Sequence, residues 1–263
     1  MKVVKVIFFM FIALFFLIGF FGSYEDSPAS LPPDEFDTDD FNLVDTIDGE
    51  LLSTHYRVWK DVDDSRRDMN FSISSMANAR SFYYRDTMNI AEDGTEKGFW
   101  RNFYFGLYDH DKETTRPLRD SILSLVKRDS IRDDHMIYTV VSLVQDIPYN
   151  YILSADSCAT HTDYPCVPLQ RYGILSPVEF LYSLSGDCDT RTVLLFTLLK
   201  EMGFDPIIVN SREYGHSMLA VDIPTGGDYF NHKGRKFYFW ETTATGWMRE
   251  CSRRICRIKI TGL

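Results

Sequence analysis

The chain has 263 residues, of which 44% are hydrophobic and 25% are charged, as in an ordinary globular protein. Its net charge of −10 would repel the phosphates of nucleic acid, so we expect no nucleic-acid partner. Ten acidic and no basic residues fall within residues 23–50, whereas residues 51–263, with 28 acids and 26 bases, are close to neutral.

The first predicted element is the uncharged apolar run Val6 to Gly22, whose 17 residues would form a helix about 25 Å long, just enough to cross a thin bilayer core. Lys2 and Lys5 precede the run and acids follow it, so the N-terminus is expected in the cytoplasm. We favour a single-pass, uncleaved membrane anchor over residues 1–22, with the bulk of the chain extracytoplasmic, in the periplasm or at the cell surface. A signal peptide cleaved near residues 27–29 is the alternative, and a buried soluble helix is favoured least.

Two segments of different composition come next. Residues 23–50 are rich in acids and prolines, which indicates a disordered acidic linker. Residues 51–115 are predicted to be a β-rich N-terminal region, because short runs of strand-forming residues at 56–59, 69–73 and 100–108 alternate with polar breaks.

Residues 116–263 are predicted to form the domain that carries the chemistry. It opens with two helices, each with one apolar face, and Pro148 ends the second. The faces consist of Leu118, Ile122, Leu125, Val126, Ile137, Val140, Val141 and Val144. An irregular stretch then leads to Ser176, a predicted N-cap that is followed by Pro177 at N1 and Glu179 at N3.

The C-terminal part continues with a helix from about Cys188 to Met202, which Gly203 closes. Strands are predicted after it at 206–210, 216–223 and 236–241, with a further one near 255–260. The order of helices followed by antiparallel strands indicates an α+β fold.

The candidate site begins at Cys188, because Asp187 is a natural N-cap and places the thiol in the first turn of its helix. A helix N-terminus stabilises a thiolate, although the flanking Asp187 and Asp189 oppose it. His216, at the start of a strand, is the candidate base, and Glu241, after the adjacent strand, is the candidate orienting carboxylate. Each residue alone is more often structural, so the hypothesis depends on their joint order.

The joint pattern resembles the bacterial transglutaminase-like superfamily and the related periplasmic cysteine proteinases. The motifs that carry the resemblance are residues 140–149, Ser176-Pro177-Val178-Glu179, Gly186-Asp187-Cys188-Asp189, Gly215-His216-Ser217-Met218 and Glu241-Thr242-Thr243 with Gly246. The resemblance covers about residues 135–250 and implies a papain-like transglutaminase core, in which the nucleophile helix packs on an antiparallel sheet.

Transferred to this chain, the resemblance makes Cys188 the nucleophile, His216 the base and Glu241 the orienting acid, where many members have Asp. Thr190 stands where calcium-dependent members have a further acid, so no metal or cofactor is expected. Gln145, at the end of the preceding helix, is a candidate oxyanion donor, with a buried amide bonded to the backbone as the alternative.

The number of cysteines also bears on the role of Cys188. Four of them lie in two sequence neighbourhoods: Cys158, Cys166, Cys251 and Cys256. An extracytoplasmic location favours two disulfides, paired locally or across, and these would leave Cys188 as the free thiol. The alternatives are free, unpaired thiols and a zinc site that contains Cys158, His161 and Cys166.

The sequence therefore predicts a membrane-anchored, extracytoplasmic thiol enzyme. It would attack a peptide or carboxamide carbonyl through a Cys188 acyl-enzyme, with protease or amidase activity favoured over transglutaminase activity. Its expected partner is a peptide or protein substrate. The alternative is a catalytically degenerate module that binds a peptide or cell-envelope component in the same groove.

Overall fold

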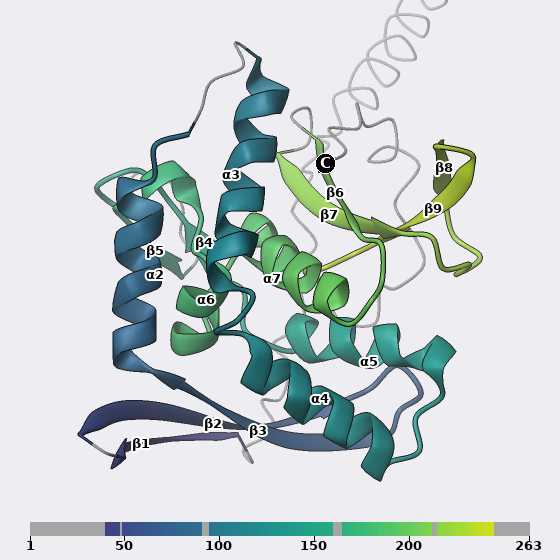
Figure 1. The fold of residues 1–263 in the computed structure, drawn as a ribbon, viewed down its shortest axis with the longest axis horizontal. Helices are drawn as coiled ribbons and strands as arrows, with labels where there is room; N and C mark the ends of the chain where they lie inside the picture. The colour runs from purple at the N-terminus through teal and green to yellow at the C-terminus, as the bar shows by residue number, and fades with distance from the viewer. Residues whose placement is uncertain (1–39, 48, 91–94, 160–164, 212–214, 245–263) are drawn as a thin grey trace, which may run out of the picture. The chain divides into compact units, whose positions relative to one another are not determined.

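Figure 1 shows the computed structural model, which describes residues 40–47, 49–90, 95–159, 165–211 and 215–244. All of these residues belong to one unit of the chain, Asp37–Leu263. Within them, six α-helices combine with two antiparallel sheets and a short parallel pair of strands. The predicted α+β class is therefore confirmed.

The first sheet contains β1 (Phe41–Ile47), β2 (Glu50–Lys60) and β3 (Arg66–Ser74), paired antiparallel in the order β1-β2-β3. Strand β2 buries every second side chain from Ser53 to Trp59, as expected for a strand with one face on the core. The composition of residues 23–50 predicts a linker, yet residues 41–47 form β1. The acids of this segment concentrate before β1, whose Leu, Val, Thr and Ile residues favour pairing with β2.

Two helices follow inside the region predicted to be β-rich: α2 (Ser75–Thr87) and α3 (Glu96–Asp111). The strand prediction for 100–108 is therefore wrong. The aromatic residues of this run have high strand propensity, but the residues that α3 buries include Phe103, Tyr104 and Leu107, at helical spacing. The Thr95 side chain also caps the helix by accepting from Gly98 N–H at 2.9 Å.

The predicted helical pair is confirmed as α4 (Arg116–Arg128) and α5 (Asp133–Gln145). In the described part of the irregular stretch after it, the regular elements are β4 (Tyr151–Ile152), β5 (Cys166–Val167) and the short 3₁₀ turn η1 (Arg171–Gly173). A disulfide joins Cys158 to Cys166, which confirms local pairing there and removes both sulfurs from the zinc alternative. Cys251, Cys256 and His161 lie outside the described residues.

Both predicted helix starts of the C-terminal part are confirmed. In α6 (Pro177–Ser183), Ser176 and Glu179 form the capping box, and in α7 (Cys188–Glu201) the Asp187 side chain accepts from Thr190 N–H at 3.1 Å. Every residue from Thr190 to Leu199 is buried. Helix α7 is therefore the central element of the core.

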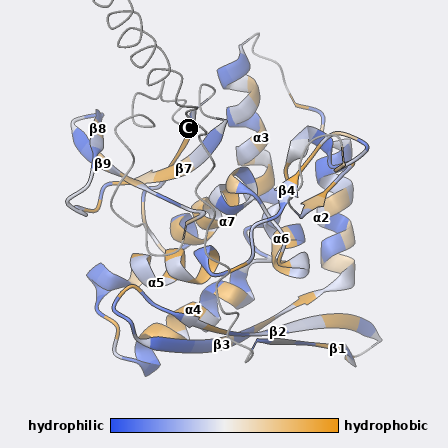
Figure 2. Cartoon of the chain, turned by 180° about the vertical axis from the view of Figure 1, so that it is seen from behind, coloured by the Kyte–Doolittle hydropathy of each residue, from blue (hydrophilic) through white to orange (hydrophobic). Residues whose placement is uncertain are grey.

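The second sheet contains β6 (Ile207–Ser211), β7 (His216–Val221), β8 (Tyr229–His232) and β9 (Arg235–Trp240), antiparallel in the order β6-β7-β9-β8. Three of these strands are predicted from the sequence and β8 is not, while the strand expected near 255–260 lies outside the described residues. Helix α7 packs on this sheet through β6 and β7 and touches α3, α5 and α6 elsewhere. In Figure 2, α5 and α7 carry orange, hydrophobic stretches.

The N-terminal helices are bonded to the rest of the core. Buried Arg85 of α2 donates to both carboxylate oxygens of Glu179 in α6, at 2.7 and 2.9 Å. Asp111 of α3 accepts from the backbone N–H of Val178 at 3.0 Å and from the Ser81 hydroxyl of α2 at 2.7 Å. These contacts fix α2, α3 and α6 as one layer.

For the helices that the structure describes, none has the length and apolar character that a bilayer crossing requires. The predicted anchor, residues 1–22, lies outside the described residues.

Candidate active site

His216 and Glu241 meet at one end of the second sheet. In the antiparallel pairing of β7 with β9, Leu219 lies opposite Trp240. Continued by one residue, this register sets Glu241 opposite Met218, which shares a strand face with His216. Glu241 Oε2 lies 3.0 Å from His216 Nε2, and both side chains are mostly buried, with 14% and 18% of their surface exposed. The structure thus brings together the predicted base and the predicted orienting carboxylate.

The Glu241 carboxylate is held on both of its oxygens. Oε1 accepts from the backbone N–H groups of Thr242 and Thr243 at 2.9 and 2.8 Å and from the Thr243 hydroxyl at 2.6 Å. Burial works to raise the pKa of Glu241, but the hydrogen bond and charge of His216, together with Thr243, lower it to about 2. Burial likewise works to lower the pKa of His216, and Glu241 outweighs it and raises that pKa. The pair therefore stabilises the imidazolium that forms when His216 takes up a proton.

Cys188 is the first residue of α7 and is a free thiol, 6% exposed. Its helix end lies beside the start of β7, because the Ser217 hydroxyl donates to Asp189 Oδ1. Burial and then the charges of Asp189 and Asp187 raise the pKa of Cys188, while hydrogen bonds from Ser217 N–H and the Tyr149 hydroxyl lower it in part. The resting site therefore favours a protonated thiol, and the nucleophile needs a base to remove its proton.

Asp189 is anchored by a buried polar network behind the nucleophile. Its Oδ1 accepts from the Tyr104 hydroxyl of α3 at 2.8 Å as well as from Ser217. Asn210 of β6 donates to the same Tyr104 hydroxyl at 3.3 Å, and its Oδ1 lies 2.9 Å from the Ser217 hydroxyl, whose one proton is shared with Asp189. This network ties α3, β6 and β7 to the first turn of α7, which fixes Cys188 in place.

Gln145, the candidate oxyanion donor, is buried at the end of α5. Its Nε2 donates to the backbone oxygen of Glu241 at 2.9 Å, which matches the alternative of an amide bonded to backbone. Its Oε1 is buried and has no hydrogen-bond partner among the described residues. Gln145 therefore belongs to the site as a support for the strand end that carries Glu241.

Two further residues at the site are not assigned a role from the sequence. The Tyr149 hydroxyl bonds to Cys188, and burial followed by the nearby charges of Cys188 and Asp187 raises the pKa of Tyr149. Arg191, in the same helix, is 0% exposed. The sequence signal for Arg191 is a charged residue three positions after the nucleophile, just before the apolar run of residues 193–196. Only tertiary contacts reveal Tyr149.

The described residues bring one group of potential metal ligands together: Asp61, Asp63 and His135, whose ligand atoms lie within 4.8 Å of one another. Arg67 already donates to Asp61 and Asp63, at 3.3 Å each, and the Thr139 hydroxyl donates to Asp61 at 2.7 Å. The group is therefore explained as an ion-pair network that joins the β2–β3 turn to α5.

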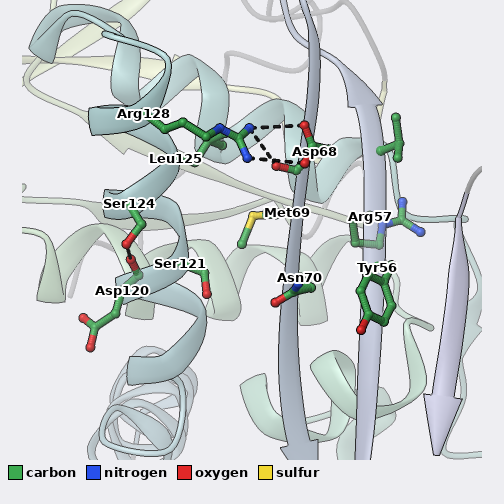
Figure 3. A pocket seen from close by; sticks show the side chains of 11 residues that line it. Tyr56, Arg57, Asp68, Met69, Asn70, Asp120, Ser121, Ser124, Leu125 and Arg128 are labelled. Carbon is green, nitrogen blue, oxygen red and sulfur yellow. Dashed lines mark hydrogen bonds and ion pairs between the residues drawn. The ribbon is translucent and has the colours of Figure 1, made fainter.

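A hollow of about 630 Å³ lies between α4 and the strands β2 and β3, away from the residues predicted for catalysis (Figure 3). Two arginines line it, and both are paired. Arg128 bonds to Asp68, as the dashed lines show, and Arg57 bonds to Asp146 at 2.6 Å. Because its cations are neutralised in this way, we assign no chemistry to this hollow.

Comparison of the chain with protein-family models, with curated proteins and with solved structures finds no match.

Proposed function

We propose that this protein is a thiol enzyme of the transglutaminase-like type, with Cys188 as nucleophile, His216 as base and Glu241 as orienting acid. The observation that carries the proposal is the buried His216–Glu241 pair at 3.0 Å. It lies on the sheet whose strand β7 bonds to the first turn of α7 through Ser217 and Asp189. A nucleophile at a helix start, a base on the neighbouring strand and a carboxylate behind that base are the elements of a catalytic triad.

The reaction would proceed through an acyl-enzyme. Glu241 occupies Nε2 of His216, so Nδ1 is the ring nitrogen left to take the thiol proton as the sulfur attacks the carbonyl carbon. The carbon–nitrogen bond then breaks, and the imidazolium returns the proton to the leaving amine. Water attacks the resulting thioester and yields a carboxylic acid and the free thiol.

The substrate class is a peptide or carboxamide, and we favour a protease or amidase over a transglutaminase because water is the abundant acceptor. The apolar run near the N-terminus supports a location outside a membrane to which the chain is anchored. The Cys158–Cys166 disulfide supports an oxidising compartment.

A binding module with a degenerate site is the second candidate, and one observation favours it. Cys188 is only 6% exposed, and its pKa is raised by burial and by the adjacent aspartates. Such a thiol is inert unless His216 removes its proton.

The decisive measurement is the rate at which iodoacetamide alkylates Cys188 in the full-length chain, followed against pH by mass spectrometry of the Cys188 peptide. The enzyme proposal predicts labelling near neutral pH that His216→Ala slows by about 10-fold or more. His232→Ala, at the end of β8 in the same sheet, is the matched control and should label like the wild type. If Cys188 is alkylated with the pH dependence of an ordinary thiol, and His216→Ala does not change the rate, the enzyme proposal is refuted and the binding module remains.

A further inference from the structure

Arg191 lies one helical turn after Cys188 and is completely buried. Its guanidinium donates to four backbone carbonyl oxygens, those of Gly186 (3.2 Å), Val144 (2.8 Å), Gln145 (3.4 Å) and Ile147. Its Cζ also lies 5.4 Å from the centre of the Tyr149 ring. One side chain therefore holds the turn before the nucleophile against the end of α5 and the segment that follows it.

The charge of Arg191 is unusual in its surroundings. Buried cations in proteins are normally paired with an anion, as buried Arg85 is with Glu179. The hydrogen bonds of the Arg191 guanidinium within the described part of the chain go to carbonyl oxygens and to no carboxylate. Burial lowers the pKa of Arg191 to about 10, which still leaves it protonated at neutral pH.

The same contacts reach the other members of the site. Gly186, which accepts from Arg191, stands two residues before Cys188 and forms a bridge with Tyr149. Gln145, which also accepts from Arg191, supports the backbone of Glu241 through its amide. A change at Arg191 would therefore act on the nucleophile and on its partners together.

We propose that Arg191 is a positioning residue of the Cys188 site, where its guanidinium fixes the turn before the nucleophile and provides a permanent positive charge for the thiolate. The inference rests on the proposed function in that it takes Cys188 as the reactive thiol. The other titratable groups that act on this thiol are Asp187, Asp189, Tyr149 and Tyr104. The His216–Glu241 pair lies on the sheet that the helix of this thiol contacts. Asp187, Asp189, Tyr149 and Tyr104 oppose a thiolate when ionised, and Arg191 is the fixed cation that offsets them.

The test compares the full-length wild type with Arg191→Gln and Arg191→Lys by the pH dependence of Cys188 alkylation. Gln keeps an N–H donor for the carbonyls but removes the charge, so the midpoint of the profile should rise by about one pH unit, with about 10-fold slower labelling at pH 7. Lys keeps the charge, so its midpoint should stay within about half a unit of the wild type.

Arg85→Gln is the matched control, because Arg85 is equally buried but pairs with Glu179 in another part of the core. It should lower thermal stability without moving the midpoint. The proposal is overturned if Arg191→Gln labels with the wild-type midpoint, or if Lys shifts the midpoint as far as Gln does. If Arg191→Gln does not fold, the test depends on Arg191→Lys alone. A midpoint of its alkylation profile more than about one pH unit above the wild type then overturns the proposal, and a midpoint at the wild-type value supports it.

Repeating the series in His216→Ala separates this inference from the proposed function. If the proposed function is wrong, Cys188 is alkylated at the same rate with and without His216. The effect of Arg191 is read from the difference between Arg and Gln within either background, so it can hold or fail independently.

Discussion

Replacing Glu241 by Gln tests whether the His216–Glu241 pair is an ion pair in the folded protein. The pKa of Glu241 falls from 4.5 to about 2 on folding, and at about 1.36 kcal/mol per pKa unit this corresponds to about 3 kcal/mol of stability. Gln keeps an oxygen for the three hydrogen bonds from Thr242 and Thr243. We therefore expect Glu241→Gln to lower the free energy of unfolding by about 2 to 3 kcal/mol where the pair is fully charged.

The loss of stability in Glu241→Gln should become smaller both at low pH and at high pH. The Glu241 contribution is complete above the unfolded pKa of 4.5 and disappears as the pH falls towards about 2. The His216 contribution is complete below the unfolded pKa of 6.5 and disappears as the pH rises through the higher folded pKa. The difference between wild type and Glu241→Gln should therefore be largest between pH 4.5 and 6.5 and shrink on both sides.

Urea unfolding of both proteins at several pH values between about 3 and 9 measures this difference directly. Glu201→Gln is the control, because Glu201 accepts from the Tyr108 hydroxyl instead of an imidazole and should show no such maximum. A difference that is flat across the pH range, or one below about 0.5 kcal/mol at pH 5.5, would refute the ion pair.

Three further predictions concern other contacts. Arg85→Met should destabilise the fold by about 3 to 5 kcal/mol in urea unfolding, because it leaves Glu179 charged and buried, and adding Glu179→Met should recover much of the loss. Tyr104→Phe should cost about 1 to 2 kcal/mol and alter the alkylation rate of Cys188, since Asp189 loses one donor; an unchanged rate would contradict the proposed anchoring. Cys158→Ser should lower stability by about 2 to 3 kcal/mol, as expected for a short disulfide loop, and reduction of the wild type should reproduce that loss.

Local signals in the sequence were enough for the helices of the C-terminal part. Asp187 and Ser176 act on backbone N–H groups only three residues away, so their caps can be read without tertiary structure. Gly203 closes α7 with a φ of 89°, a conformation that few other residues adopt readily.

The secondary-structure predictions that are wrong or missing fall where tertiary contacts decide the structure. Helix α3 forms from strand-prone aromatic residues because Phe103 and Leu107 are buried together at helical spacing. Strand β8 is joined to β9 by a two-residue turn in which Lys233 and Gly234 both have positive φ, and Lys-Gly is a weaker turn signal than Asn-Gly. At the site, the order of Cys188, His216 and Glu241 is visible in the sequence, whereas the partners that hold them come from distant segments.

The N-terminal region cannot be a separate module beside the chemistry. Tyr104 of α3 holds the carboxylate directly after the nucleophile, and Tyr108, one turn later, donates to Glu201 at the other end of α7 at 2.6 Å. A single helix thus contacts α7 at both of its ends. A fragment that begins at residue 116 would expose the face of α7 that α3 covers and would remove Tyr104, one of the two donors that Asp189 has among the described residues. The part of the chain that the sequence assigns to an accessory β unit is therefore a structural component of the candidate active site.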